Sequence, residues 1–135
     1  MSDPTPAEIR IRVPIRWRDL DPLGHLNQAV YHELLEEGRS AMVEKLRSEA
    51  EFTFVLARVE LDYRNEVRRE HGAVNVISRV ESVGRSSIVL VDAILLDDGT
   101  VVAEGRSVLV AWDPAARRSR PLTSDERERL LRGSP

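Results

Sequence analysis

Ten residues, 19–28 (DLDPLGHLNQ), bring side chains that could do chemistry into one short polar segment. The segment holds two carboxylates, Asp19 and Asp21, and an imidazole, His25. A strand-like pattern precedes it and a helix-like pattern follows, so the segment ends where a helix should begin. Unpaired backbone N–H groups and the helix dipole stabilise negative charge at such a helix start. The segment therefore suits a reaction in which a carbonyl oxygen gains negative charge.

Each of these residues also has a purely structural interpretation. Asp21 precedes a proline, and Asp-Pro often initiates a turn. Asp19 is expected mainly to fix the loop by accepting backbone N–H groups. Asn27 is a candidate N-cap, and capping is compatible with a place beside the reacting carbonyl. His25 could orient a carboxylate, bind the substrate or be satisfied locally in the loop, and these alternatives stay open.

A strand before this segment and a long helix after it are expected to position it. Apolar residues alternate with polar ones over residues 8–17, which predicts a strand with one buried face. Pro14 lies on its polar face and favours an edge position or a local irregularity. Over residues 28–47 apolar residues recur every four positions, which predicts a helix. Gly38 interrupts the apolar stripe at a cost in helix propensity, and so predicts close packing against a sheet.

Four more strands are predicted after the helix, over residues 55–64, 73–83, 87–96 and 100–112. The third of these is apolar enough to suggest burial on both faces, and Gly105 in the fourth is a possible bulge. Residues 123–126 (TSDE) form a capping box before a short charged helix. The two tryptophans, Trp17 and Trp112, are expected in the core or at an interface. One helix covers one face of such a sheet, so we expect the other face to meet a second subunit.

The composition indicates a single soluble domain spanning residues 1–135, with residues 1–7 flexible. Hydrophobic residues make up 41% and charged residues 32%, which is ordinary for a globular protein. The absence of cysteine excludes disulfides, thiolate catalysis and Cys-ligated metal sites. A net charge of −3 provides no global field for nucleic acid or an anionic membrane. With no transmembrane-length run and no signal-peptide core, a cytoplasmic location is expected.

No cofactor and no metal are expected either. Asp19, Asp21, His25 and His32 are the nearest approach to a ligand set, but their spacing matches no standard metal motif.

The order of elements resembles the hotdog fold, in which an antiparallel sheet wraps one long helix. Residues 16–31 (RWRDLDPLGHLNQAVY), with residues 36–39 (EEGR), are similar to acyl-CoA thioesterases of the 4-hydroxybenzoyl-CoA thioesterase type. They are also similar to the related plant acyl-carrier-protein thioesterases. Shorter similarities bring the coverage to most of residues 9–131. The resemblance implies an α+β fold: a five-stranded antiparallel sheet around a central helix, with a short C-terminal helix. It also implies a homodimer or homotetramer with active sites at the subunit interface.

The same resemblance implies roles for loop residues. In that family the second aspartate of the D-x-D pair is the catalytic carboxylate, which here is Asp21. A backbone N–H at the start of the long helix polarises the thioester carbonyl, which places that donor at Gln28 with Asn27 beside it. The plant branch uses D-x-N-x-H, and Asp21 and His25 match its ends. Leu23 occupies its middle position, so the amide role of that branch is not reproduced.

A second carboxylate candidate lies on the helix itself. Other hotdog branches place their catalytic carboxylate there, so Glu36 is the reserve candidate. The simpler interpretation is that Glu36, Glu37 and Arg39 form a solvated or salt-bridged helix face.

Hydrolysis of a thioester needs a nucleophile or base, an oxyanion donor and room for water. The helix dipole favours an ionised Asp21. Its carboxylate could attack the carbonyl and form a mixed anhydride, or activate a water. The N–H of Gln28 would contribute about 3 kcal/mol to the transition state if it resembles other oxyanion donors.

The phosphates of CoA require cationic contacts. Arg85, Ser86 and Ser87 follow a glycine and could present a guanidinium with two hydroxyls to a phosphate. Arg64, Arg68 and Arg69 form a second cluster, and a solvated turn is the alternative for each group. The residues expected to bind substrate are Gly24, Tyr63, Arg64, Arg85, Ser86 and Ser87.

The sequence therefore predicts an acyl-CoA thioesterase. One alternative is an acyl-carrier-protein thioesterase, and another is a non-catalytic acyl-CoA-binding hotdog domain. A hotdog dehydratase is less favoured, because no histidine and carboxylate pair across a dimer can be singled out.

Overall fold

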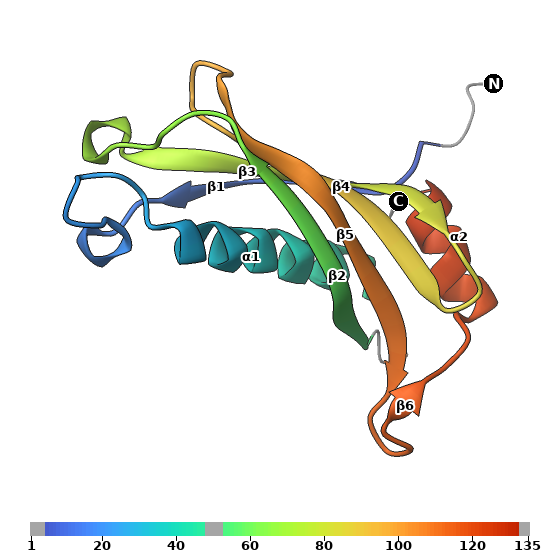
Figure 1. Cartoon of the computed structure of the whole chain (residues 1–135). Helices are drawn as coiled ribbons and strands as arrows, with labels where there is room; N and C mark the ends of the chain where they lie inside the picture. The colour runs from blue at the N-terminus through green and yellow to red at the C-terminus, as the bar shows by residue number, and fades with distance from the viewer. Residues whose placement is uncertain (1–4, 48–52, 133–135) are drawn as a thin grey trace.

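A computed structural model describes residues 5–47 and 53–132. A curled antiparallel sheet wraps around one long helix, and a short helix closes one end (Figure 1). The helices in this part of the chain are α1 (Gln28–Leu46) and α2 (Ser124–Arg132). The strands are β1 (Glu8–Pro14), β2 (Phe54–Tyr63), β3 (Ala73–Val83), β4 (Ser87–Leu95), β5 (Val101–Asp113) and the two-residue β6 (Arg118–Ser119).

The strands lie in the order β1-β3-β4-β5-β2, with β6 paired to the end of β5. Every pair is antiparallel, and β1 and β2 are the two edges. The edge position predicted from Pro14 is therefore confirmed. The first strand is shorter than predicted, because a 3-10 turn over Trp17–Asp19 follows it. Trp17 is 77% exposed there, so it is not part of this chain's core.

The bulge predicted at Gly105 is wrong. Gly105 pairs in register with both neighbouring strands, and the irregularity in the β2–β5 pair lies between Leu56 and Arg58. A Cβ on Gly105 would collide with the backbone carbonyl of Glu60. The glycine therefore permits the close approach of two backbones rather than an extra residue.

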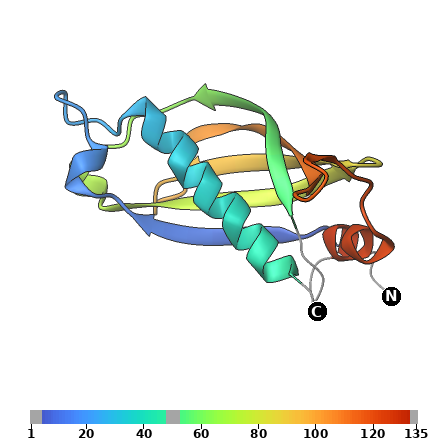
Figure 2. The ribbon, with the colours of Figure 1, turned by 90° about the horizontal axis from the view of Figure 1, so that it is seen from below.

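Helix α1 begins one residue after its N-cap, Asn27, whose side-chain oxygen accepts the N–H of Ala29 at 2.9 Å. Gly38 packs directly against β3. A Cβ placed on Gly38 would lie 2.9 Å from Cγ1 of Val76. The close packing predicted from this glycine is therefore confirmed, and Figure 2 shows α1 crossing the concave face of the sheet.

Among the described residues the core consists of two apolar clusters, one under each half of α1. The first includes Leu34, Leu35, Val67, Val74, Val76 and Ile94. The second includes Met42, Leu46, Val80, Ile88, Leu90 and Leu130.

On β4 only alternate residues are buried within this chain, and the outward ones, such as Val89 and Val91, are half-buried. Burial on both faces is therefore not reached in one chain, and cover of the outer face by a second subunit stays a prediction.

The capping box before α2 is confirmed. The N–H of Glu126 donates to Oγ1 of Thr123 at 3.1 Å, and the N–H of Thr123 donates to Oε1 of Glu126 at 2.8 Å. Of the residues 1–7 expected to be flexible, 1–4 lie outside the described residues. Ala7 is buried, and its N–H donates to the carbonyl of Leu130 at 2.9 Å. Neither described helix is long and apolar enough to cross a membrane.

Gly38→Val is expected to lower the free energy of unfolding by about 1–3 kcal/mol, because the added side chain must displace Val76 or α1. Urea denaturation followed by circular dichroism measures the change. Ser40→Val places the same side chain on an exposed position of α1 and serves as the matched control. Equal losses in the two variants would contradict the close packing of Gly38.

Candidate active site

The loop between β1 and α1 is a tight, internally bonded turn. Leu20 and Leu26 form an antiparallel bridge, and the N–H of Asp21 donates to the carbonyl of His25 at 2.8 Å. Gly24 closes the turn with φ +81°, in a region that other residues rarely adopt. The loop is therefore a defined platform for its side chains.

The carboxylate of Asp21 is held by the backbone of its own loop. Its Oδ1 accepts the N–H of Leu23 at 2.9 Å and that of His25 at 3.1 Å. No described residue donates to Oδ2. One oxygen therefore fixes the direction of the carboxylate, and the other remains available to a reacting group.

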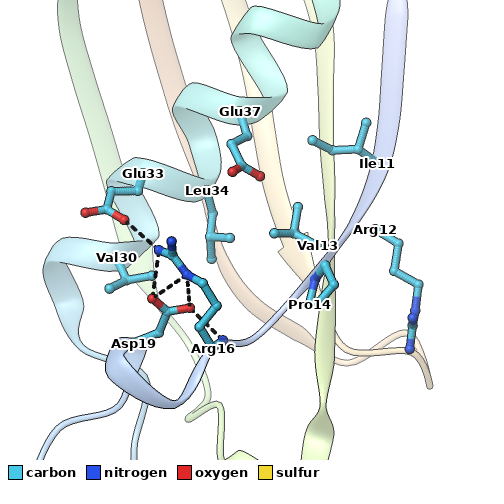
Figure 3. Close-up of a pocket in the computed structure, with 10 residues that line it drawn as sticks. All are labelled: Ile11, Arg12, Val13, Pro14, Arg16, Asp19, Val30, Glu33, Leu34 and Glu37. Atoms are coloured by element: carbon cyan, nitrogen blue, oxygen red, sulfur yellow. Dashed lines mark hydrogen bonds and ion pairs between the residues drawn. The ribbon is translucent and has the colours of Figure 1, made fainter.

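Asp19 has the contacts of a residue that holds the loop. It is 5% exposed, and its carboxylate accepts the backbone N–H of Arg16 at 2.8 Å and the guanidinium of Arg16 at 2.9 Å. Its carbonyl accepts the N–H of Asn27 at 2.8 Å, which ties it to the start of α1. Burial opposes ionisation, but the hydrogen bonds and charge of Arg16 lower the pKa of Asp19 below its ordinary value. Figure 3 shows this pair at the edge of a cavity of about 350 Å³ between β1 and α1.

The start of α1 offers a backbone donor beside the loop. Asn27 caps the N–H of Ala29, and its own carbonyl accepts the N–H of Val30 at 2.9 Å. The N–H of Gln28, the first residue of the helix, has no acceptor among the described residues. It is the donor in this turn that can reach an external oxygen.

The loop, the helix start and the end of β2 line an open pocket of about 420 Å³. Its lining residues are Asp21, Leu23, His25, Leu26, Gln28, Tyr31, Tyr63, Arg64, Asn65 and Glu66. The fold thus brings together five residues predicted for the site: Asp21, His25, Gln28, Tyr63 and Arg64. Gly24 and Asn27 support the same pocket through the turn and the cap.

The predicted phosphate contact lies elsewhere. The carbonyl of Arg85 accepts the N–H of Leu122, and that of Ser86 accepts the N–H of Ala111. The turn that carries Arg85, Ser86 and Ser87 therefore lies near α2, at the opposite end of the sheet from the Asp21 loop (Figures 1 and 2). Within one chain these residues do not reach the pocket.

The helix face predicted to be solvated or salt-bridged is salt-bridged, and Arg39 on it is buried. Arg39 is 4% exposed and pairs with Glu36 at 2.9 Å, whereas the Glu36 side chain is 62% exposed. Glu36 lines a different pocket, farther along α1. Arg68, from the second arginine cluster, pairs with Glu66 and Glu70.

Sequence reasoning missed two contributors to the site, Glu66 and Tyr31. Oε2 of Glu66 lies 2.8 Å from Nε2 of His25. Tyr31 meets Tyr63 edge to face, with ring centroids 5.0 Å apart, and burial raises the pKa of Tyr31. Tyr31 stands four residues after the helix cap and could have been inferred from that spacing. No local pattern marks Glu66, since only the crossing from β2 to β3 brings it to the loop.

A curled antiparallel sheet around one long helix is the arrangement of the hotdog fold. Comparison with known proteins assigns the family. The profile of the thioesterase-like superfamily matches residues 15–130, and the chain belongs to this superfamily.

Solved structures with the same fold support this assignment. A thioesterase from Thermus thermophilus, complexed with coenzyme A and Zn, is 34% identical with a TM-score of 0.80, covering 93% of this chain and 95% of its own. A predicted thioesterase from Bacillus stearothermophilus is 27% identical with a TM-score of 0.83, covering 96% and 99%. A proposed acyl-CoA thioesterase from Xanthomonas campestris is 29% identical with a TM-score of 0.69, covering 78% and 93%. No curated protein matches the chain.

Asp19→Ala is expected to lower the free energy of unfolding by about 1–3 kcal/mol at neutral pH, because Arg16 loses a buried, hydrogen-bonded partner. The pKa of Asp19 is lowered in the folded protein, so its stabilisation is complete well above the ordinary value of 3.8 and is lost in acid. The difference from wild type should therefore shrink as the pH falls.

Urea titrations at several pH values measure this effect. Glu128→Ala removes an exposed partner of Arg132 and should change little. A pH-independent difference for Asp19→Ala would contradict the role assigned to Asp19.

Proposed function

We propose that this protein is an acyl-CoA thioesterase that hydrolyses the thioester to a free acid and CoA. One observation carries the proposal. A single pocket contains Asp21, with one carboxylate oxygen free of hydrogen bonds from the described residues, and the N–H of Gln28, which no described residue accepts. The Thermus thermophilus thioesterase was solved with coenzyme A, which supports CoA as the carrier of the acyl group. The name of the Xanthomonas campestris protein supports an acyl-CoA as the substrate.

The geometry supports two routes to the products. In one, Oδ2 of Asp21 attacks the thioester carbon, the CoA thiolate leaves, and water hydrolyses the mixed anhydride. In the other, Asp21 takes a proton from a water that attacks the same carbon. In both, negative charge develops on the carbonyl oxygen, and the N–H of Gln28 stabilises it at the start of α1. Neither route needs a strong acid, because a thiolate is a good leaving group.

His25 supports this reaction mainly from its backbone. Its N–H donates to Asp21, and its imidazole is held by Glu66 at the mouth of the pocket. The proposal therefore gives His25 a part in holding the loop and leaves the attack on the carbonyl to Asp21. Arg64 is the one arginine or lysine in the lining of this pocket and, although it also pairs with Glu104 at 3.2 Å, is the candidate to meet a phosphate of CoA.

We also propose that the enzyme works as a dimer paired along β2. This strand is a ten-residue sheet edge, with Val55 37%, Leu56 44% and Tyr63 44% exposed. A long edge with exposed apolar residues favours pairing with another strand. Antiparallel pairing of two β2 strands would bring the Phe54 end of one copy to the Tyr63 end of the other, beside the pocket.

Such a dimer would extend the pocket into the partner. A groove of about 410 Å³ near the start of β2 is lined in part by Val43, Phe54, Leu56 and Leu109. Its apolar side chains suit an acyl group. The turn of Arg85, Ser86 and Ser87 lies level with the Phe54 end of β2, two strands away, so in this proposal it can contribute to CoA binding only from another subunit.

Asp21→Asn is expected to lower kcat for acyl-CoA hydrolysis by about three orders of magnitude or more, because the amide can neither attack nor accept a proton. Thiol release from a panel of short, long, branched and aromatic acyl-CoAs measures the effect and identifies the acyl class. Asp125→Asn, at an exposed position on α2, is the control and should keep wild-type activity. Undiminished turnover by folded Asp21→Asn would sink the assignment.

The same panel separates the alternatives. Saturable binding of acyl-CoA without thiol release would identify a binding domain rather than an enzyme. Release only from an acyl group carried on a protein-bound pantetheine would identify an acyl-carrier-protein thioesterase.

Leu56→Lys is expected to convert the dimer to a monomer and to abolish activity with it, because it places a charge on the edge strand. Size-exclusion chromatography with light scattering measures the mass. Leu131→Lys makes the same change at a 40% exposed position on α2 and should leave the assembly intact. A wild-type chain that is monomeric and active, or a dimeric Leu56→Lys, would exclude this interface.

A further inference from the structure

A row of buried polar side chains crosses the concave face of the sheet beneath the middle of α1. Ser78 on β3, Asp92 on β4 and Ser107 on β5 are each no more than 1% exposed. The hydroxyl of Ser78 donates to Oδ1 of Asp92 at 2.8 Å, and the hydroxyl of Ser107 donates to Oδ2. We call these three residues the polar row. It occupies a position in the core where apolar residues would be expected.

Helix α1 supplies the charge that faces the polar row. Nη1 of Arg39 donates to Oγ of Ser107 at 3.1 Å, and its Nε and Nη2 donate to Oε2 of Glu36. Gly38 lets the helix come this close, since a Cβ there would lie 3.3 Å from Oγ of Ser78. The glycine and the arginine thus act together at one point of the helix.

The polar row separates the two apolar clusters of the core. Leu35, one turn before Arg39, belongs to the first cluster, and Met42, about one turn after it, belongs to the second. Sliding α1 by one turn would move Arg39 into an apolar cluster and place a leucine or methionine over Asp92. A buried charge without its partner is strongly destabilising, so this register is strongly preferred over its neighbours.

A buried carboxyl is costly to keep. Burial raises the pKa of Asp92, although hydrogen bonds from Ser107 and Ser78 and the charge of Arg39 oppose the rise. Well-packed apolar side chains in place of a buried ionic group are often as stable or more so. The best-attested use of such groups is to specify register, as a buried polar residue does in a coiled coil.

Register bears directly on the active-site pocket. The loop of Asp21 is tied to the start of α1 and, through the N–H of Leu26 and the carbonyl of Val67 at 2.8 Å, to the connection after β2. Tyr63 ends β2, and Arg64 and Glu66 belong to that connection. Gln28 lies eleven residues before Arg39, about 16 Å along a stiff helix at 1.5 Å per residue. A shift of α1 at the polar row therefore pulls on the bond between Leu26 and Val67 and moves Gln28 relative to Tyr63 and Arg64.

We propose that Asp92, with Ser78, Ser107 and Arg39, is a positioning network that fixes the register of α1 on the sheet and so aligns the two halves of the active-site pocket. None of these four residues lines the pocket of Asp21, and Ser78, Asp92 and Ser107 also lie outside the groove near the start of β2, which Arg39 lines. The effect on catalysis rests on the proposed function, whereas the register itself does not.

The test replaces the network with apolar side chains in the variant Ser78→Ala/Arg39→Met/Asp92→Leu/Ser107→Ala. The chain has no cysteine, so two cysteines introduced by His32→Cys on α1 and Arg79→Cys on β3 would each take one spin label, with no other labelling site. Pulsed electron–electron double resonance, with labelled chains diluted in unlabelled ones, then reports the distance between helix and sheet. We expect one narrow distribution for wild type and, for the variant, a broadened one or a shift of about 5 Å, one helical turn.

Activity and stability complete the test. We expect the variant to keep a melting temperature close to wild type and to lose at least tenfold in kcat, which a network that only stabilises the fold would not do. If the variant with all four substitutions does not fold, the single substitution Asp92→Asn is used in its place. Arg120→Met/Glu126→Leu removes a second, largely buried ion pair, at α2, and should leave the helix–sheet distance and kcat unchanged.

Two results would overturn the proposal. An unchanged distance distribution in a folded network variant excludes the register role. A shifted distribution with undiminished kcat excludes the link to the reaction. If wild type hydrolyses no acyl-CoA, the proposed function fails, and the label distances still decide the register.

Discussion

The close contact between α1 and the concave face of the sheet at Gly38 is the constraint on which the rest of the structure depends. Because no side chain separates the helix from Val76 there, α1 lies deep in the curl of the sheet and buries an apolar cluster under each half. Because α1 lies so close to the sheet, its first turn comes beside the connection between β2 and β3. The N–H of Leu26 can then bond the carbonyl of Val67, and a pocket forms between loop, helix and sheet.

Local patterns predicted the parts of the fold that local interactions determine. The start of α1 was predicted from Asn27, whose side chain bonds a backbone N–H of the first turn, and the predicted bounds of β3 match the observed ones. The carboxylate loop was likewise recognised as one unit. Trp17 shows the limit of such patterns, since alternation continued past Pro14 into a turn that exposes the ring. Gly105 shows another, because its role depends on a neighbouring strand far away in sequence.

Parts of the site assembled from distant segments could not be predicted for the same reason. Glu66 reaches His25 only because β2 ends beside the loop. Arg85 belonged to a plausible phosphate motif, but the length of β3 carries it to the opposite end of the sheet. Arg39 was predicted on a solvated or salt-bridged helix face, and its pair with Glu36 fits that prediction. Its burial follows from Ser78, Asp92 and Ser107 on three strands, which no one-dimensional pattern connects.

The free edge of β2 also has a consequence for the behaviour of the protein in a crowded solution. Arg58, Glu60 and Asp62 place charges of both signs along it, and Arg58 and Glu60 pair with each other. Charges on an edge strand discourage indiscriminate stacking, whereas neutral apolar edges readily join into fibrils. These charges disfavour pairing with a neutral apolar segment. They favour pairing with a strand that carries opposite charges at the facing positions.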